Sequence, residues 1–134
     1  MSDDALFPKG AALVVGASGG IGGKIAEVLA ADGCNLALVF NRKADAAQAV
    51  AMRVSARATT HRCDVTSMED IERLVANAIS EHGRIHTLVW AAGPLVDQLN
   101  LSETPIEKWR TAFEVEVHGF FALSMALVRF FWGR

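Results

Sequence analysis

Three glycines near the N-terminus have a spacing that can hold a phosphate. Gly16, Gly20 and Gly22 follow an apolar run at residues 11–15 and precede a stretch typical of a helix. Glycine permits tight turns and close backbone approach, so this spacing favours a buried strand that turns directly into a helix. The amides at such a helix N-terminus, together with the helix dipole, bind anions such as a dinucleotide pyrophosphate. The sequence therefore predicts a phosphate-binding turn.

Each glycine is expected to have a separate role in this turn. Gly16 permits the tight turn, Gly20 lets the backbone approach the phosphates, and Gly22 lets the helix pack closely on the strand. The alternative is that these glycines only shape a sheet scaffold without a ligand. The residues expected to line the phosphate site are Gly16, Ala17, Ser18, Gly20, Ile21 and Gly22.

Apolar runs alternate with helical patterns along the whole chain. This alternation predicts an α/β fold with a doubly wound parallel sheet and right-handed crossovers. Thr66 and Thr104 are expected to cap the third and fourth helices. The expected strands are 13–15, 36–40, 57–63 and 85–90, and the expected helices are 20–31, 43–56, a third opening at 66 and closed by Gly83, and a long fourth from 105 to the end.

Two helices are expected to pack through large apolar residues. The first would use Ile21, Ile25, Val28 and Leu29. The apolar face of the last would comprise Trp109, Phe113, Val117, Phe120, Phe121, Leu127, Val128 and Phe131.

The end of the second predicted strand carries cations where an acid could stand. In nucleotide-binding sheets an Asp or Glu at this point bonds the free ribose 2′-hydroxyl, whereas an Arg accommodates a 2′-phosphate. Here the strand is followed by Asn41, Arg42 and Lys43. This favours NADP over NAD as the cofactor. Alternatively, Arg42 and Lys43 only solvate a surface loop and the start of the next helix.

At these residues the chain resembles the short-chain dehydrogenase/reductase family. Residues 15–22 match its Thr-Gly-x-x-x-Gly-x-Gly motif, with Val15 in place of the threonine. Asp64 and Val65 match the pair that lies near adenine, although Asp64 could instead serve a turn or cap. The stretch Trp90-Ala91-Ala92-Gly93 matches the Asn-Asn-Ala-Gly motif in part, with both asparagines lost.

The resemblance implies a Rossmann-like sheet of four strands in the order 3-2-1-4, incomplete relative to the family. It also implies that Ala91, Ala92 and Gly93 adjoin the cofactor. Glu116 stands where the family has an asparagine that supports a proton relay. It is a weak catalytic candidate, because a carboxylate can hold a water, and the equal alternative is a solvent-facing helix residue. His118 is expected to be structural, and no metal site is expected.

The catalytic serine, tyrosine and lysine of the family would follow the residues present here. The chain has 134 residues and contains no tyrosine, whereas family members reach roughly 250 residues, within the size range of one domain. We expect residues 1–134 to be a single cofactor-binding domain, truncated before the catalytic segment. The complete protein would transfer hydride between the nicotinamide and a carbonyl or alcohol substrate, and the isolated chain would be inactive. The alternative is a non-catalytic nucleotide-binding module or partner subunit.

Composition limits the partners and the compartment. The net charge of −2 has both signs mixed along the chain, which argues against nucleic acid. Cys34 and Cys63 lack metal or redox spacing. The apolar segment 120–132 is interrupted by Ser124 and Arg129 and is too short to span a bilayer. We therefore expect a cytoplasmic protein without membrane contact.

The last helix and the fourth strand are expected to drive self-association. The strand would form an exposed sheet edge, which can pair with another chain. The helix would expose a combination of Phe120, Phe121, Phe130, Phe131 and Trp132. We expect a homo-oligomer formed through this helix.

Overall fold

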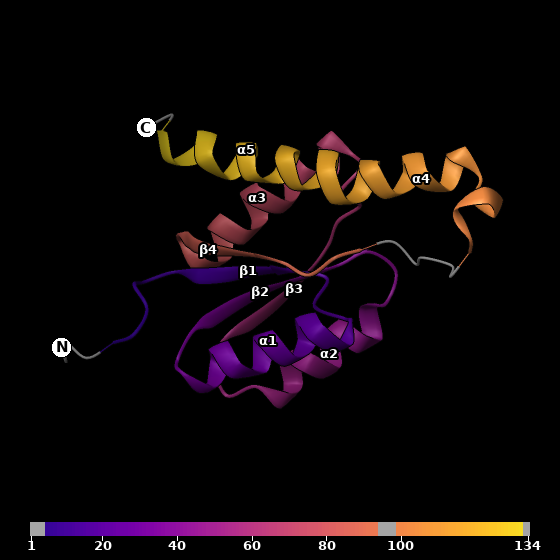
Figure 1. Ribbon diagram of the computed structural model, residues 1–134. Helices are drawn as coiled ribbons and strands as arrows, with labels where there is room; N and C mark the ends of the chain where they lie inside the picture. The colour runs from indigo at the N-terminus through magenta and orange to yellow at the C-terminus, as the bar shows by residue number, and fades with distance from the viewer. Residues whose placement is uncertain (1–4, 94–98, 133–134) are drawn as a thin grey trace.

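A parallel sheet lies between two layers of helices (Figure 1). The computed structural model describes residues 5–93 and 99–132. Helices α1 and α2 cover one face, and α3 and the C-terminal helix cover the other. The elements are β1 (Ala11–Val15), α1 (Gly20–Ala31), β2 (Asn35–Phe40), α2 (Ala44–Arg53), β3 (Ala58–Arg62), α3 (Met68–His82), β4 (Ile85–Trp90), the 3₁₀ turn η1 (Leu101–Glu103), α4 (Ile106–Phe113), the π-helical segment η2 (Glu114–Gly119) and α5 (Phe120–Trp132).

The strand order is β3-β2-β1-β4, and every neighbouring pair is parallel. The predicted α/β class and strand order are confirmed. Val15 at the end of β1 lies between Val39 of β2 and Trp90 of β4. All four carboxyl ends therefore meet at one edge, and the order reverses between β1 and β4. Ligands of open α/β sheets bind in the crevice at such a reversal.

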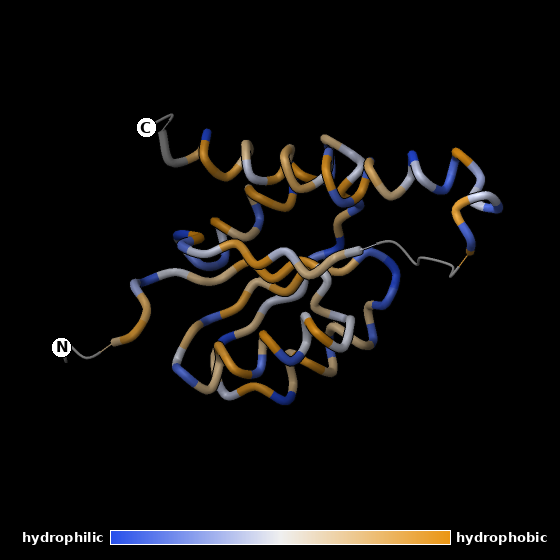
Figure 2. The backbone as a smooth tube through the Cα atoms, in the orientation of Figure 1, coloured by the Kyte–Doolittle hydropathy of each residue, from blue (hydrophilic) through white to orange (hydrophobic). Residues whose placement is uncertain are grey.

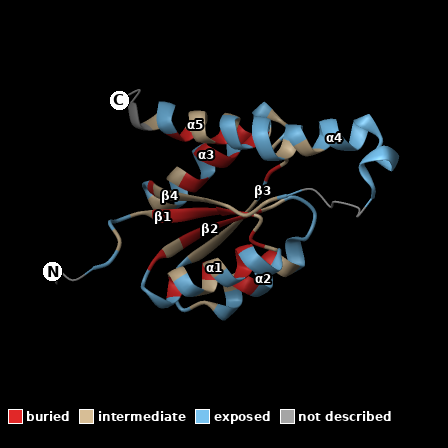
Figure 3. Cartoon of the chain, in the orientation of Figure 1, coloured by how far each residue is buried: buried red, intermediate tan, exposed pale blue. Residues whose placement is uncertain are grey.

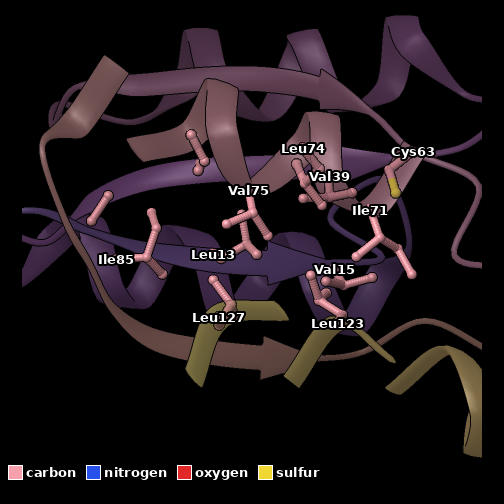
Figure 4. Packing of buried hydrophobic residues seen from close by; sticks show 13 residues of the cluster. Leu13, Val15, Val39, Cys63, Ile71, Leu74, Val75, Ile85, Leu123 and Leu127 are labelled. Carbon is pink, nitrogen blue, oxygen red and sulfur yellow. The ribbon is translucent and has the colours of Figure 1, made fainter. Parts of the chain in front are cut away.

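The core consists of two clusters, one on each face of the sheet. Successive residues of a strand point to opposite faces, so Leu13 and Val15 face α3 while Val14 faces α1. The first cluster also contains Ile71 and Leu74 of α3 and Leu123 of α5 (Figure 4). Every residue of β1 is buried, which makes it the strand that holds both layers together.

The predicted face of α1 is correct only in part, because Leu29 packs against the core cluster on that side of the sheet and Ile25 is half-buried. The buried residues of the helix are Gly22, Gly23, Ala26 and Ala30, whereas the side chains of Ile21 and Val28 are exposed. Small residues let this helix approach the sheet closely, and the larger side chains are left on the outside. The glycine turn, rather than apolar periodicity, decides which face of the helix is buried.

The C-terminal helix runs through α4, η2 and α5 without interruption. Its predicted apolar face is also mostly wrong, because the residues buried on it are Gly119, Leu123 and Leu127. Apolar residues recur along this helix (Figure 2), yet α4 projects past the sheet and is exposed (Figure 3). Its exposed large apolar residues are Ile106, Trp109, Phe113, Val117, Phe120, Phe121 and Val128. The side chains of Phe131 and Trp132 lie outside the described residues.

The C-terminal helix is longer than the apolar segment 120–132. Residues Ile106–Phe130 form 25 helical residues, enough in length and composition to cross a membrane. The expectation that this segment is too short is therefore wrong for the helix as a whole. Leu123 and Leu127, however, pack into the core cluster between the sheet and α3, as in a helix that covers a sheet.

Both predicted helix caps lie one position from the observed ones. Ser67, not Thr66, caps α3 by accepting from the Asp70 amide, because the Thr66 hydroxyl is bonded to Asp64. Pro105 occupies the N-cap position of α4, because the Thr104 hydroxyl donates to the Asn100 carbonyl.

Candidate functional site

The turn after β1 is held by backbone contacts on both sides. Gly16 has φ +84°, a conformation that L side chains rarely adopt. Its amide donates to the Val39 carbonyl of β2 at 3.1 Å. On the other side, a Cβ added to Gly16 would lie 2.6 Å from the Ala91 carbonyl carbon and the Ala92 nitrogen. Only glycine fits this position, as the sequence predicts for a tight turn.

Gly22 meets the same turn from the first turn of α1. A Cβ there would collide with the Gly16 carbonyl oxygen and would lie 2.8 Å from the Gly16 carbonyl carbon. The neighbouring Ala17 is buried, and its amide bonds the Val39 carbonyl at 3.2 Å. Close packing of helix on strand therefore accounts for Gly22.

Neither close packing nor a left-handed backbone conformation requires glycine at position 20. A Cβ on Gly20 would lie more than 4 Å from every other described residue apart from its chain neighbours and the backbone of α1, and the φ of Gly20 is not in the left-handed region. No side chain caps α1, and its first turn carries no acidic residue. Ile21 beside it is 76% exposed, and Ser18 is half-buried. This helix N-terminus is open and suited to an anion.

An open groove of about 440 Å³ runs beside the turn, between α1 and α2. Ser18, Gly19 and Gly20 line one side, and Ala46 and Val50 line the other. The mouth of the phosphate turn therefore continues into space large enough for part of a ligand.

The segment after β2 carries the predicted cations. Asn41, Arg42 and Lys43 are exposed and follow directly on the strand that bonds the glycine turn. Arg62, the last residue of β3, adds a cation that the sequence reading missed. Its Nε donates to the Asn41 carbonyl at 3.2 Å. Arg62 reaches this segment because it pairs in register with Phe40, the last residue of β2. The register between two strands is not apparent from the sequence pattern, so Arg62 was not predicted.

Asp64 forms a turn with Thr66. Its Oδ1 accepts from the Thr66 hydroxyl at 2.7 Å and from the Thr66 amide at 2.9 Å. These hydrogen bonds, with smaller help from the charges of Arg62 and Arg42, hold the pKa of Asp64 below its ordinary value. The turn role, one of the two alternatives, is therefore present. Val65 beside it packs against Gly119, where an added Cβ would lie 3.0 Å from Cγ2.

The end of β4 completes the site. The Ala91 amide donates to the Val15 carbonyl at 2.8 Å, and Ala91 and Ala92 are half-buried. Gly93 is exposed, and a Cβ on it would lie 3.2 Å from Oε1 of Glu116. Glu116 is exposed but faces this loop. It therefore adjoins the predicted site and is open to solvent at the same time.

Glu116 lies in the π-helical segment η2, which the sequence reading did not foresee. Such single wide turns are rare and often occur at functional sites. In the same segment His118 Nδ1 lies 2.9 Å from Glu114 Oε1, on the exposed helix surface. That contact fits the structural role expected of His118. Within residues 5–93 and 99–132, no cluster of three or more His, Cys, Asp or Glu could hold a metal ion.

The strand order and the glycine turn at its reversal define a Rossmann-like α/β fold. The family model described as short chain dehydrogenase matches residues 10–134. The chain therefore belongs to the short-chain dehydrogenase/reductase family, whose members are NAD- or NADP-binding oxidoreductases.

Individual relatives agree with this family. The short-chain reductase protein NovJ of Streptomyces niveus is 35% identical over 127 residues, which are 93% of this chain and 48% of that protein. A dehydrogenase/reductase from Sinorhizobium meliloti 1021 has a TM-score of 0.84 at 28% identity, over 92% of this chain and 50% of its own. A short chain dehydrogenase from Burkholderia cenocepacia J2315, solved in complex with NADP, has a TM-score of 0.82 at 29% identity, over 90% of this chain and 50% of its own. The chain thus spans about half the length of each of these three proteins.

Proposed function

We propose that this chain is the NADP(H)-binding part of a short-chain oxidoreductase. In this proposal residues 1–134 form a single dinucleotide-binding domain. The complete protein transfers hydride between the nicotinamide, which supplies the hydride chemistry when bound, and a small carbonyl or alcohol substrate. The observation that carries the proposal is Gly20, whose missing side chain leaves room that no atom of the described residues fills.

The residues of the turn fit a pyrophosphate. The uncapped N-terminus of α1 offers backbone donors, and the absence of acid in its first turn avoids repulsion. Gly16 and Gly22 keep the turn tight, and Ala17, Ser18 and Ile21 complete the cradle. The adenine would lie by Asp64 and Val65, and the nicotinamide half by Ala91, Ala92 and Gly93, since the crevice opens between β1 and β4.

The cofactor preference is assigned to NADP rather than NAD. Asn41 and Arg42 follow β2 where an acid would bond a free 2′-hydroxyl. Arg42 is exposed and can form bidentate bonds with a 2′-phosphate. The related dehydrogenase solved in complex with NADP is consistent with this assignment.

Gly20→Ala tests the site directly. The new Cβ would enter the open space at the turn, so we expect NADPH affinity to fall at least about tenfold, as for about 1.4 kcal/mol. Folding stability should be unchanged or higher by about 0.4–1 kcal/mol, because the backbone conformation suits alanine. Ala31→Gly, at the far end of α1, is the matched control. It should lower the melting temperature and leave NADPH binding unchanged.

The result that contradicts this proposal is equally concrete. Calorimetric titration that finds no NADPH binding by the parent chain, or the same affinity in Gly20→Ala, would refute the phosphate site. A loss of binding in Ala31→Gly would mean that stability, not the cradle, was being measured.

Catalysis is not assigned to any residue of this chain. The chain contains no tyrosine, so it has no Tyr-x-x-x-Lys pair to protonate an alkoxide. Loss of a positioned acid/base alone slows such chemistry by about 10²–10⁴-fold. We therefore expect no appreciable carbonyl reduction by the chain itself. The absence of this pair also favours the second candidate, a non-catalytic nucleotide-binding module or partner subunit.

The two candidates differ in a single assay. NADPH oxidation with a panel of ketones and aldehydes should be absent for this chain and present for a version extended to the natural end of the gene. Activity in neither version would favour the non-catalytic module. Turnover by the short chain, abolished by Glu116→Gln, would make Glu116 the acid and overturn both.

The exposed apolar surface of the C-terminal helix suggests a second copy of the chain as a partner. The proposal includes a homo-oligomer through the C-terminal helix and a cytoplasmic protein with no nucleic-acid or membrane contact. The exposed aromatic residues Trp109, Phe113 and Phe121 support an apolar interface. Analytical ultracentrifugation should detect self-association, and a monomer at all concentrations would contradict it.

A further inference from the structure

A second guanidinium group lies at the carboxyl ends of β2 and β3. Arg62 ends β3 and pairs in register with Phe40, the last residue of β2. Its Nε donates to the carbonyl of Asn41, the residue just before Arg42. This bond fixes the guanidinium against the segment that carries Arg42.

Arg42 and Arg62 differ from four other arginines of the described residues in having no carboxylate within ion-pair distance. Among the described residues no ion pair is found for Arg42 or Arg62, although both are exposed. Four other arginines each have a carboxylate partner: Arg53 with Glu27, Arg57 with Glu81, Arg73 with Asp70 and Arg110 with Glu107. Unpaired like charges held near one another favour an added anion.

Asp64 is the carboxylate on which both arginines act. Its Oδ1 is already engaged by the Thr66 hydroxyl and amide. Asp64 therefore offsets only part of the positive charge. It also repels anions, which limits the affinity that the two arginines can provide.

The geometry of the guanidinium suits a phosphate. With Nε bonded to Asn41, the two terminal nitrogens remain as donors, and one planar group can give a phosphate two parallel hydrogen bonds. A phosphomonoester carries enough oxygens to accept from a second arginine as well. We propose that Arg62 is a specificity-determining residue that, together with Arg42, binds the 2′-phosphate of NADP. The proposal rests on the proposed cofactor function.

NADPH and NADH are the probes, because they differ only in that phosphate. We expect Arg62→Gln to weaken NADPH binding by about 10- to 100-fold, as for loss of hydrogen bonds to a charged group. NADH binding should change less than about twofold, since no contact to it is lost. Arg62→Lys should lie between the parent and Arg62→Gln, because it keeps the charge but loses the fork.

Arg57→Gln is the matched control. Arg57 lies just before the opposite end of β3 and is paired with Glu81. Its replacement should leave the NADPH to NADH affinity ratio unchanged. An unchanged NADH affinity in Arg62→Gln also verifies that the variant is folded.

The failures of the two proposals are distinguishable. If the parent prefers NADPH, Arg42→Gln reduces the preference and Arg62→Gln does not, then the role of Arg62 is refuted and the cofactor function stands. If the parent binds both equally, or neither, the NADP assignment falls and takes the role of Arg62 with it. A loss of preference in both arginine variants, with Arg57→Gln unaffected, supports the two-arginine site.

Discussion

The two edges of the sheet differ in the way their polar groups are satisfied. The edge strand β3 is polar, with the sequence Ala-Thr-Thr-His-Arg, whereas the edge strand β4 reads Ile-His-Thr-Leu-Val-Trp. Natural sheets protect free edges with polar and charged residues. By this criterion β3 has the composition of a protected free edge, whereas β4 has less of this protection.

Side-chain hydrogen bonds cover β3. The Thr59 hydroxyl lies 2.8 Å from Nε2 of His61 and 2.7 Å from Nε2 of His82. A hydroxyl has one proton, so it donates to one imidazole and accepts from the other. Gln48 of α2 donates to the Thr60 hydroxyl at 3.1 Å. Both faces of this edge therefore have polar partners.

Near β4 the described residues contain unsatisfied groups. Nε2 of His86 and Nε1 of Trp90 are buried without a hydrogen-bond partner, as is Oγ of Ser124 on the adjoining α5. Such groups are uncommon in native proteins and require an explanation. The exposed aromatic residues lie on the same C-terminal helix. A covering segment or second copy beside β4 would explain the exposed aromatic residues.

Gly16→Ala should have the largest effect on folding stability, because it disrupts the close packing of the glycine turn against the residues that follow β4. The new Cβ would be 2.6 Å from the Ala91 carbonyl, and φ +84° is strained for alanine. We expect a loss of about 3–5 kcal/mol in unfolding free energy, measured by urea titration.

Gly33→Ala is the control for that variant. Gly33 has a similar φ of +88°, but an added Cβ meets nothing within 4 Å. It should therefore show only the conformational strain, about 1–2 kcal/mol. Equal losses at the two positions would show that contact with the end of β4 contributes nothing.

Leu123→Ala tests how far β4 depends on the helix above it. Leu123 is fully buried in the cluster that contains Leu13, Val15 and Ile71 (Figure 4). Its truncation should lower the unfolding free energy by about 2–5 kcal/mol. Val128→Ala, on the exposed side of α5, should change it by less than about 0.5 kcal/mol. A small effect of Leu123→Ala would mean that α5 is not part of the stable core.

The parts of the fold that follow from local chemistry were predictable from the sequence. Alternating apolar runs predicted the parallel α/β sheet, the family resemblance implied its strand order, and Gly16 and Gly22 have the predicted turn and packing roles. The tight turn at Gly16 and its contact with Gly22 involve residues close in the sequence, although Gly16 also meets Ala91 at the distant end of β4. Gly20 remains a prediction, because its proposed role concerns a ligand.

The parts that depend on distant partners were not predictable. The predicted face of α1 was only partly right, because close packing of this helix on the sheet buries its small residues and leaves Ile21 and Val28 exposed. The contact of Arg62 with Asn41 required the register of β2 against β3. The face of the C-terminal helix was wrong because only α5 has the sheet beneath it, while α4 extends beyond (Figure 1).

Acid should weaken the β3 edge through its two histidines. Burial holds the pKa of His61 and of His82 below 6.5, the ordinary value. The unfolded chain therefore takes up protons first as the pH falls below about 6.5, so stability present above that value is lost progressively as the pH falls through the lowered pKa values of the folded chain. The melting temperature should fall over this window.

A double variant assigns that pH dependence to β3. His61→Gln with His82→Gln should flatten the decline, leaving a smaller contribution from His86, whose pKa burial also lowers. His118→Gln, on the exposed surface of η2, is the control and should leave the decline caused by the β3 histidines in place. An unaltered slope in the double variant would show that the network around Thr59 does not resist protonation.

Phe121→Gln should have the smallest effect on folding and the clearest effect on association. Phe121 is 64% exposed, so its replacement should change the unfolding free energy by less than about 0.5 kcal/mol. If the C-terminal helix mediates self-association, the same change should shift the population toward monomer in sedimentation velocity. Met52→Gln is the control, because Met52 is 83% exposed on α2, beside the β3 half of the sheet. Equal shifts from both variants would mean that general surface hydrophobicity causes association, and the difference between the two halves of the sheet would then have no bearing on it. A shift from Phe121→Gln alone would place the interface on the side of the molecule where β4 and its unsatisfied groups lie.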